Sequence, residues 1–282
     1  MASTPAGSST ALYDHMYYLR AAERSKTRLR QGLILLVLIA ITAWAAQGTE
    51  FSIVKFVKGL GFGFDFFVRS MPPNLDHAGR IGFRLLETMA IALLGTTFGA
   101  LFAIPLAFLA SRNIVKSRLI CQVVRVFIDS FRGISEVVWA FLMVAAVGLG
   151  PFPGVLALTI HNTGSLGKYF SETIENTNPG ILEAAAASGA NPIQIAFRAV
   201  FPELRPLFSN YVFFYFEASV RAATILGIVG AGGIGLEFII QIKQLNYPGA
   251  LTVVIAMLLL VILTDRISAL VRRHLTGVEM RT

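Results

Sequence analysis

Charged residues are scarce in this chain. Only 14% of its 282 residues are Asp, Glu, Lys or Arg, 55% are hydrophobic, and the mean hydropathy is +0.68. Soluble domains carry about 25% charged residues. The single cysteine, Cys121, excludes an internal disulfide and a cysteine-based metal site. This composition excludes an ordinary soluble domain and indicates a protein that lies in a membrane.

Sequence patterns of enzymes are also missing. The chain has no G-x-x-x-x-G-K-[ST] phosphate loop, and no residues at metal-ligand or nucleophile–base spacing. Its net charge of +8 does not follow a basic stripe interleaved with aromatic residues, so no nucleic-acid partner is expected. We predict that this chain has no catalytic residue, binds no metal and binds no cofactor.

One glycine-rich segment does match G-x-G-x-x-G, through Gly230, Gly232 and Gly235. A dinucleotide site requires a preceding strand and an acidic residue about twenty positions later. Here the segment follows an apolar run, and Val253–Ala256 stands where the acid should be. The small residues, Gly233 included, instead predict close helix packing and a bend.

Long apolar runs dominate the rest of the sequence. Because about 20 apolar residues cross a bilayer, we predict an all-α polytopic membrane protein of about six transmembrane helices. The six runs are Leu33–Ala46, Leu85–Ala110, Ile134–Leu149, Val155–Phe170, Leu207–Val229 and Ala250–Leu263. The first run also resembles the core of a signal peptide, but about thirty residues precede it, which favours a retained helix.

The distribution of basic residues orients these spans. An even number of spans places both termini on one side, and 17 Lys and Arg residues then lie on that side against 5 on the other. Cytoplasmic loops are enriched in Lys and Arg. We therefore expect both termini to be cytoplasmic. The expected organisation is a basic N-terminal segment (1–32), a first span (33–46), an extracytoplasmic segment (47–84), a core (85–273) and a tail (274–282).

Within the extracytoplasmic segment, the alternation of Gly and Phe before Met71-Pro72-Pro73 predicts an interfacial helix followed by a turn. Contact of this segment with an external partner is an open alternative.

A polar island interrupts the apolar runs at residues 178–203. Asn178-Pro179 is a helix-start signal, and it predicts a helix over Ile181–Ser188 that Gly189 ends in a left-handed conformation. Asn191-Pro192 predicts a second helix over Ile193–Phe201, ended by Pro202. Two short helices with an alanine-rich face suit close approach by another protein.

This island resembles the EAA loop of ABC importer permeases, whose pattern is E-A-A, three residues, G, nine residues, I-x-L-P. Glu183, Ala184, Ala185, Gly189 and Pro202 match it, while Ala199 and Phe201 replace the apolar Ile and Leu. The resemblance implies that the island is a coupling helix seated in a separate ATPase. The residues expected to contact the ATPase are Glu183, Ala184, Ala185, Ser188, Gly189, Arg198 and Pro202.

Two further stretches, Trp139–Glu172 and Phe216–Phe238, resemble the permeases of phosphonate, phosphite and phosphate importers. The likeness extends over about Leu85–Arg273. It implies a type I ABC importer permease fold in a prokaryotic plasma membrane and a homodimer. It also implies two ATP-binding subunits that hold ATP and Mg, and an extracytoplasmic solute-binding lipoprotein. Import of another small solute, such as an amino acid, and secondary transport are the alternatives.

Polar residues within the spans are candidates for the translocation path, because intramembrane ionisable residues usually face the bundle interior or a wet cavity. The candidates are Glu217, Arg221, Thr224, His161 and Asn162. Glu217 and Arg221 share one helix face. Two interpretations are open for this pair: a mutual ion pair, or a path in which Arg221 meets an anionic solute. A packing role is favoured for His161, and Asn162 favours a polar cavity.

Overall fold

The computed structural model describes residues 30–49 and 52–276, and within these ranges every regular element is a helix. This confirms the predicted all-α class. The chain divides into two compact units, 1–65 and 66–282. The predicted tail (274–282) and most of the basic N-terminal segment (1–32) lie largely outside the described residues.

The first unit contains the helix Arg30–Gly48, which coincides with the first predicted span. A second helix, α2 (Ile53–Arg69), begins in this unit and continues across the boundary at Asp65. An interfacial helix followed by a turn at Met71-Pro72-Pro73 was predicted here. The structure confirms a helix, and Met71-Pro72-Pro73 lies in the irregular segment after it.

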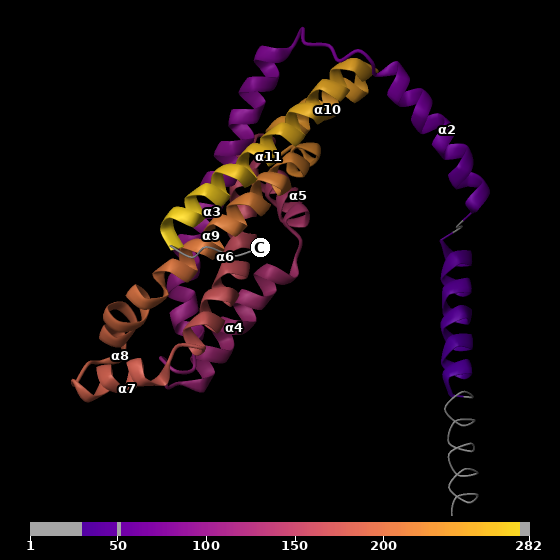
Figure 1. Ribbon diagram of the computed structural model, residues 1–282. Helices are drawn as coiled ribbons and strands as arrows, with labels where there is room; N and C mark the ends of the chain where they lie inside the picture. The colour runs from indigo at the N-terminus through magenta and orange to yellow at the C-terminus, as the bar shows by residue number, and fades with distance from the viewer. Residues whose placement is uncertain (1–29, 50–51, 277–282) are drawn as a thin grey trace, which may run out of the picture. The chain divides into compact units, whose positions relative to one another are not determined.

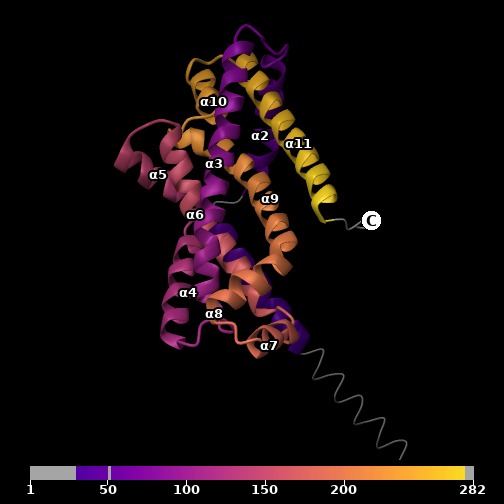
Figure 2. The same ribbon diagram turned by 90° about the vertical axis from the view of Figure 1, so that its left-hand side faces the viewer.

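The second unit holds the remaining helices. They are α3 (Ala78–Ala110), α4 (Arg118–Gly133), α5 (Glu136–Val147), α6 (Pro151–Glu175), α7 (Pro179–Ala187), α8 (Pro192–Gln194), the π-helix η1 (Ile195–Val200), α9 (Phe201–Leu226), the 3-10 helix η2 (Gly227–Val229), α10 (Ile234–Lys243) and α11 (Tyr247–Thr276). Helices α3, α6 and α9 contact one another, and α11 contacts α9 and α3. Figures 1 and 2 both show α7 and α8 at one end of this unit and α10 at the other.

Helix α6 is the centre of this unit, since it contacts α3, α4, α5 and α9. Two apolar clusters lie around it: Ile91, Leu158 and Leu226 belong to the first, and Phe170 and Phe208 to the second. Helix α3 packs closely because Gly99 faces α6; a Cβ at this position would lie 2.6 Å from the Asn162 Cβ.

Four helical stretches of the described residues are long and apolar enough to cross a membrane, and a fifth is added if α4 and α5 count as one broken span. Helix α6 covers the fourth predicted span but falls outside this set. It is rich in polar residues, several of which are buried against other helices, so protein rather than lipid surrounds much of its surface.

The third predicted span, Ile134–Leu149, is not a complete helix. Helix α5 has only 12 residues, and it is bent by 88° from α4 at the break between them. Ile134 and Ser135 are extended at this break, and the Ser135 hydroxyl accepts a hydrogen bond from the Val137 amide. The Trp139 indole donates to the Phe131 carbonyl across the bend at 3.2 Å. The predicted third span therefore corresponds to α5, which is long enough to cross a membrane only together with α4, as one broken span.

Candidate coupling surface and translocation residues

Helix α7 has the local geometry that the polar island predicts. The Asn178 side chain accepts a hydrogen bond from the Gly180 amide at 2.9 Å, and Pro179 occupies the first turn. Gly189 adopts φ +80, which L side chains rarely adopt. The predicted start and stop signals of this helix are therefore confirmed.

The second part of the island differs from its prediction. Asn191 and Gln194 form a capping box, with bonds of 2.8 and 3.0 Å, but the helix does not end at Pro202. Instead η1 leads directly into α9, in which Pro202 lies at the first turn. Pro202 lacks an N–H, so it omits one backbone hydrogen bond of this continuous helix. The π turns of η1 lie immediately before it, and Phe201 donates its amide to the Ala196 carbonyl.

The outer surface of α7 is exposed. Glu183, Ala184, Ser188 and Gly189 are exposed, and Ala185 is half-buried. Arg198 and Pro202 are exposed farther along the chain. The opposite side packs against the membrane helices through Leu182, Ile195, Ala196 and Val200. We call this exposed surface the coupling surface; it is defined by the seven residues of the predicted ATPase contact.

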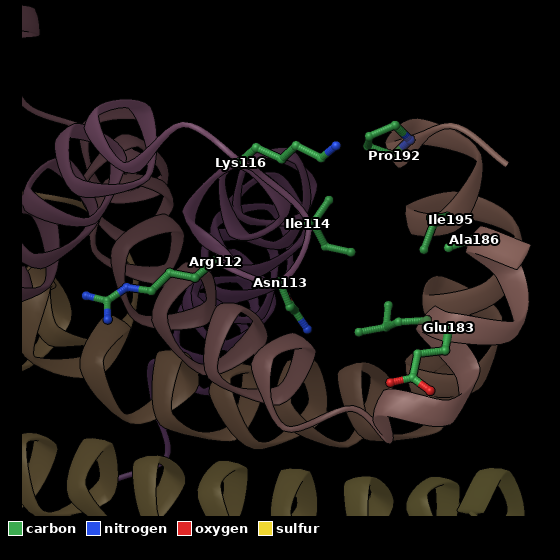
Figure 3. Close-up of a pocket in the computed structure, with 9 residues that line it drawn as sticks. Arg112, Asn113, Ile114, Lys116, Glu183, Ala186, Pro192 and Ile195 are labelled. Atoms are coloured by element: carbon green, nitrogen blue, oxygen red, sulfur yellow. The ribbon is translucent and has the colours of Figure 1, made fainter. Parts of the chain in front are cut away.

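A notch of about 280 Å³ separates the coupling surface from the loop that follows α3. Figure 3 shows Glu183, Ala186 and Ile195 on one side of this notch, with Asn113 and Ile114 facing them. Glu183 therefore lies at the edge of a recess as well as on an exposed helix.

Glu217 and Arg221 do not pair with each other. Glu217 lies 2.6 Å from Arg272, and Arg221 lies 3.3 Å from Asp265, so both partners belong to α11. The mutual ion pair is therefore wrong, because cross-helix partners take both charges. The hydroxyl of Thr224 donates to the Arg221 carbonyl at 2.6 Å. The Arg221–Asp265 pair is about half exposed, at 47% for each side chain.

Replacing Glu217 by Gln should destabilise the membrane domain by about 3 kcal/mol, because a buried ion pair loses one of its partners. This is the low end of the usual range, since the Arg272 side chain is 24% exposed. The control is Asp265→Asn, which disrupts the exposed Arg221 pair and should cost less than about 1 kcal/mol. Thermal unfolding in detergent measures both. Equal midpoints for the two variants would contradict the ranking.

Asn162 is buried between helices in this structure. It is 2% exposed, and its amide donates to the Ser219 hydroxyl at 2.9 Å. The Thr96 hydroxyl donates to Ser219 at 3.0 Å, so one polar cluster joins α3, α6 and α9. These hydroxyl partners satisfy the Asn162 amide in this structure.

His161 lies beside the bend between α4 and α5. Its Nδ1 is 3.2 Å from the Ile134 carbonyl, and its Nε2 is 3.8 Å from Glu136 and 3.5 Å from the Ser165 hydroxyl. The structure thus places His161 in a packed, hydrogen-bonded setting, separate from Glu217 and Arg221.

The glycine-rich segment joins the end of α9 to the start of α10 through a bend. Gly230, Gly232 and Gly233 have φ values of +91, +75 and +74, and Gly235 packs on the end of α9. The Ile234 amide donates to the Thr88 hydroxyl at 2.8 Å, which fixes the start of α10 against α3.

Sequence reasoning missed three charged residues that contact polar side chains of the helical bundle. Asp265 and Arg272 are the partners described above, and Glu237 is fully buried in α10 beside Gln241, whose amide donates to it at 2.8 Å. Glu237 could have been found from the sequence, because it is a single acidic residue within an apolar helix. Among residues 30–49 and 52–276, no three His, Cys, Asp or Glu side chains are grouped to hold a metal ion.

The second unit is thus a bundle of long apolar helices with the polar island exposed at one end. Comparison with known protein families identifies one family. The chain belongs to the family described as binding-protein-dependent transport system inner membrane component, whose model matches residues 95–277.

Relatives with described functions agree with this class. The phosphite transport system permease protein PtxC of Stutzerimonas stutzeri is 36% identical over 210 residues, which cover 73% of this chain and 74% of that protein. The phosphate-import permease protein PhnE of Mycolicibacterium smegmatis is 37% identical over 207 residues, 73% of this chain and 39% of that protein.

Solved structures support the fold. The permease of the MetNI methionine ABC transporter, in an inward-facing form, has a TM-score of 0.60 and 23% identity. The match covers 70% of this chain and 96% of that chain. The fold is therefore that of a type I ABC importer permease.

Proposed function

We propose that this chain forms the translocation path for a phosphorus oxyanion, phosphonate, phosphite or phosphate, in an ATP-driven importer. The observation that supports it most is the 36–37% identity to a phosphite and a phosphate permease over nearly three quarters of the chain. Family membership supports a binding-protein-dependent system, with an extracytoplasmic solute-binding lipoprotein as the donor.

The coupling surface receives the force in this proposal. Two copies of the chain present two such surfaces to two ATPase subunits, which hold the ATP and Mg. When ATP brings the ATPases together, each moves its coupling surface and rocks the helices from inward-facing to outward-facing. Both termini and the coupling surface face the cytoplasm. Two cross-helix ion pairs between α9 and α11 support a joint movement of these helices.

Arg221 is the candidate contact of the oxyanion. Its pairing with Asp265 is loose and half exposed, so a planar guanidinium remains accessible to an oxygen fork. A weak hold suits transport, because a tight site would slow release.

Uptake distinguishes the oxyanion from the alternative solute, an amino acid. The test uses cells that lack their own phosphonate and phosphite uptake and that express this chain with the ATPase and the solute-binding protein of the proposed importer. These cells should grow on phosphite or phosphonate as sole phosphorus source. An empty vector is the control. Growth equal to the control, together with ATP-dependent uptake of methionine, would favour the amino-acid importer.

A further inference from the structure

A second recess lies between the α3–α4 loop and the first two turns of α4. It has a volume of about 490 Å³, and its polar lining is mostly cationic: Arg112, Lys116, Arg118, Gln122 and Arg125. We call it the basic pocket. Four positive side chains around one concavity raise the local affinity for anions.

Only one of these four charges is compensated. Arg125 pairs with Glu175 and donates to the Ala110 carbonyl at 2.9 Å. The backbone amide of Arg112 also donates to Glu175, at 2.8 Å. Within the described part of the chain, the side chains of Arg112, Lys116 and Arg118 have no recorded ion pair. Several cations elsewhere in the helices do have acidic partners, for example Arg84 with Glu87.

The start of α4 adds to this positive field. Ser117 precedes the helix, but its side chain makes no capping hydrogen bond, so the first-turn amides remain available to an anion. Arginine forks and free amides together match the oxygens of a phosphate group.

An apolar stripe runs beside the cationic one. Arg118, Gln122 and Arg125 follow helical spacing on α4, and Leu119, Val123 and Val126 follow the same spacing one residue later. These three apolar side chains are 75%, 59% and 61% exposed. Parallel cationic and apolar stripes are typical of helices that lie at a lipid headgroup boundary.

From these features we infer that the basic pocket binds the phosphate group of an anionic phospholipid, whose acyl chains lie along Leu119, Val123 and Val126. A free phosphate ion would use the same cationic groups but would leave the apolar stripe uncovered. The inference does not depend on which solute is transported.

The test uses the full-length chain purified in detergent and three additives: phosphatidylglycerol, phosphatidylcholine with the same acyl chains, and inorganic phosphate. Binding is measured by native mass spectrometry and by the thermal midpoint. Phosphatidylglycerol should bind and raise the midpoint more than phosphatidylcholine, and inorganic phosphate should leave the midpoint unchanged.

Charge removal identifies the site. Lys116→Gln with Arg118→Gln should weaken phosphatidylglycerol about 25-fold, about fivefold for each charge near the headgroup. The matched control is Arg205→Gln with Lys243→Gln, two exposed cations outside the pocket, and it should bind as the wild type does. Arg112→Gln serves as a second variant if the double variant has a lowered midpoint without lipid.

Three results would overturn the inference. Equal binding of the two lipids removes the requirement for negative charge. An equal midpoint shift with inorganic phosphate makes the pocket a free-anion site. The lipid binds elsewhere if the Lys116 and Arg118 double variant keeps the wild-type affinity for phosphatidylglycerol. The same conclusion follows if the control variant loses as much affinity as the double variant.

Discussion

Gly189→Trp is expected to abolish ATP-driven uptake while the membrane domain stays folded. A Cβ at Gly189 meets no atom of this chain within 4 Å, so the indole has space in the protomer itself. It would occupy the exposed coupling surface, where the proposed ATPase contact requires a close approach. The backbone at φ +80 adds a strain of about 1 kcal/mol, which a multi-helix domain tolerates.

The matched control is Gly189→Ala, which has the same backbone strain without the bulk. Gly189→Ala should retain most of the uptake, and its thermal midpoint should match that of Gly189→Trp. The ATPase should copurify with the alanine variant and be lost from the tryptophan variant. Normal uptake with Trp at this position would remove the coupling role from the surface.

Local signals allowed α7 to be predicted accurately. Asn178 caps the helix and Gly189 ends it, and both act through atoms within a few residues of the chain. The bend at the glycine-rich segment was predictable for the same reason, because a run of glycines is the usual source of consecutive positive φ values.

Partners distant in sequence were not predictable. Arg272 is 55 residues beyond Glu217, and Asp265 is 44 residues beyond Arg221, so no spacing rule relates them. Helix spacing indicated only that Glu217 and Arg221 could pair with each other. In the structure each pairs with a residue of α11 instead. The contacts of Asn162 were not predictable for the same reason, since its hydroxyl partners lie 57 and 66 residues away.

The uninterrupted helix at Pro202 has a consequence for coupling. Because η1 and α9 form one continuous helical path, a displacement of α8 is passed to α9 without an intervening loop. Helix α9 is in turn tied to α11 by the Glu217 and Arg221 ion pairs. Single π turns often occur at functional sites, and here the π turns lie between α8 and α9 and contain Arg198 of the coupling surface. This continuity supports force transmission from the coupling surface into the bundle.

Gly235→Leu is expected to destabilise the membrane domain by about 3 kcal/mol or more. A Cβ at Gly235 would lie 2.0 Å from the Thr224 carbonyl oxygen and 3.1 Å from the Gly227 Cα, and both are backbone atoms that cannot rotate away. Overpacking costs about 1–3 kcal/mol where side chains can adjust, and occasionally more. Here the ends of α9 and α10 must separate, and this disturbs the hydrogen bond that the Ile234 amide donates to the Thr88 hydroxyl.

The control is Gly79→Ala in α3, where a Cβ meets nothing within 4 Å. It should leave the midpoint unchanged or raise it, because alanine favours a helix by about 1 kcal/mol over glycine. Thermal unfolding in detergent, with size-exclusion profiles for both variants, measures the difference. If Gly235→Leu unfolds at the wild-type temperature, the junction of α9 and α10 can accommodate a large side chain. Close packing of Gly227 and Gly235 would then not stabilise that junction.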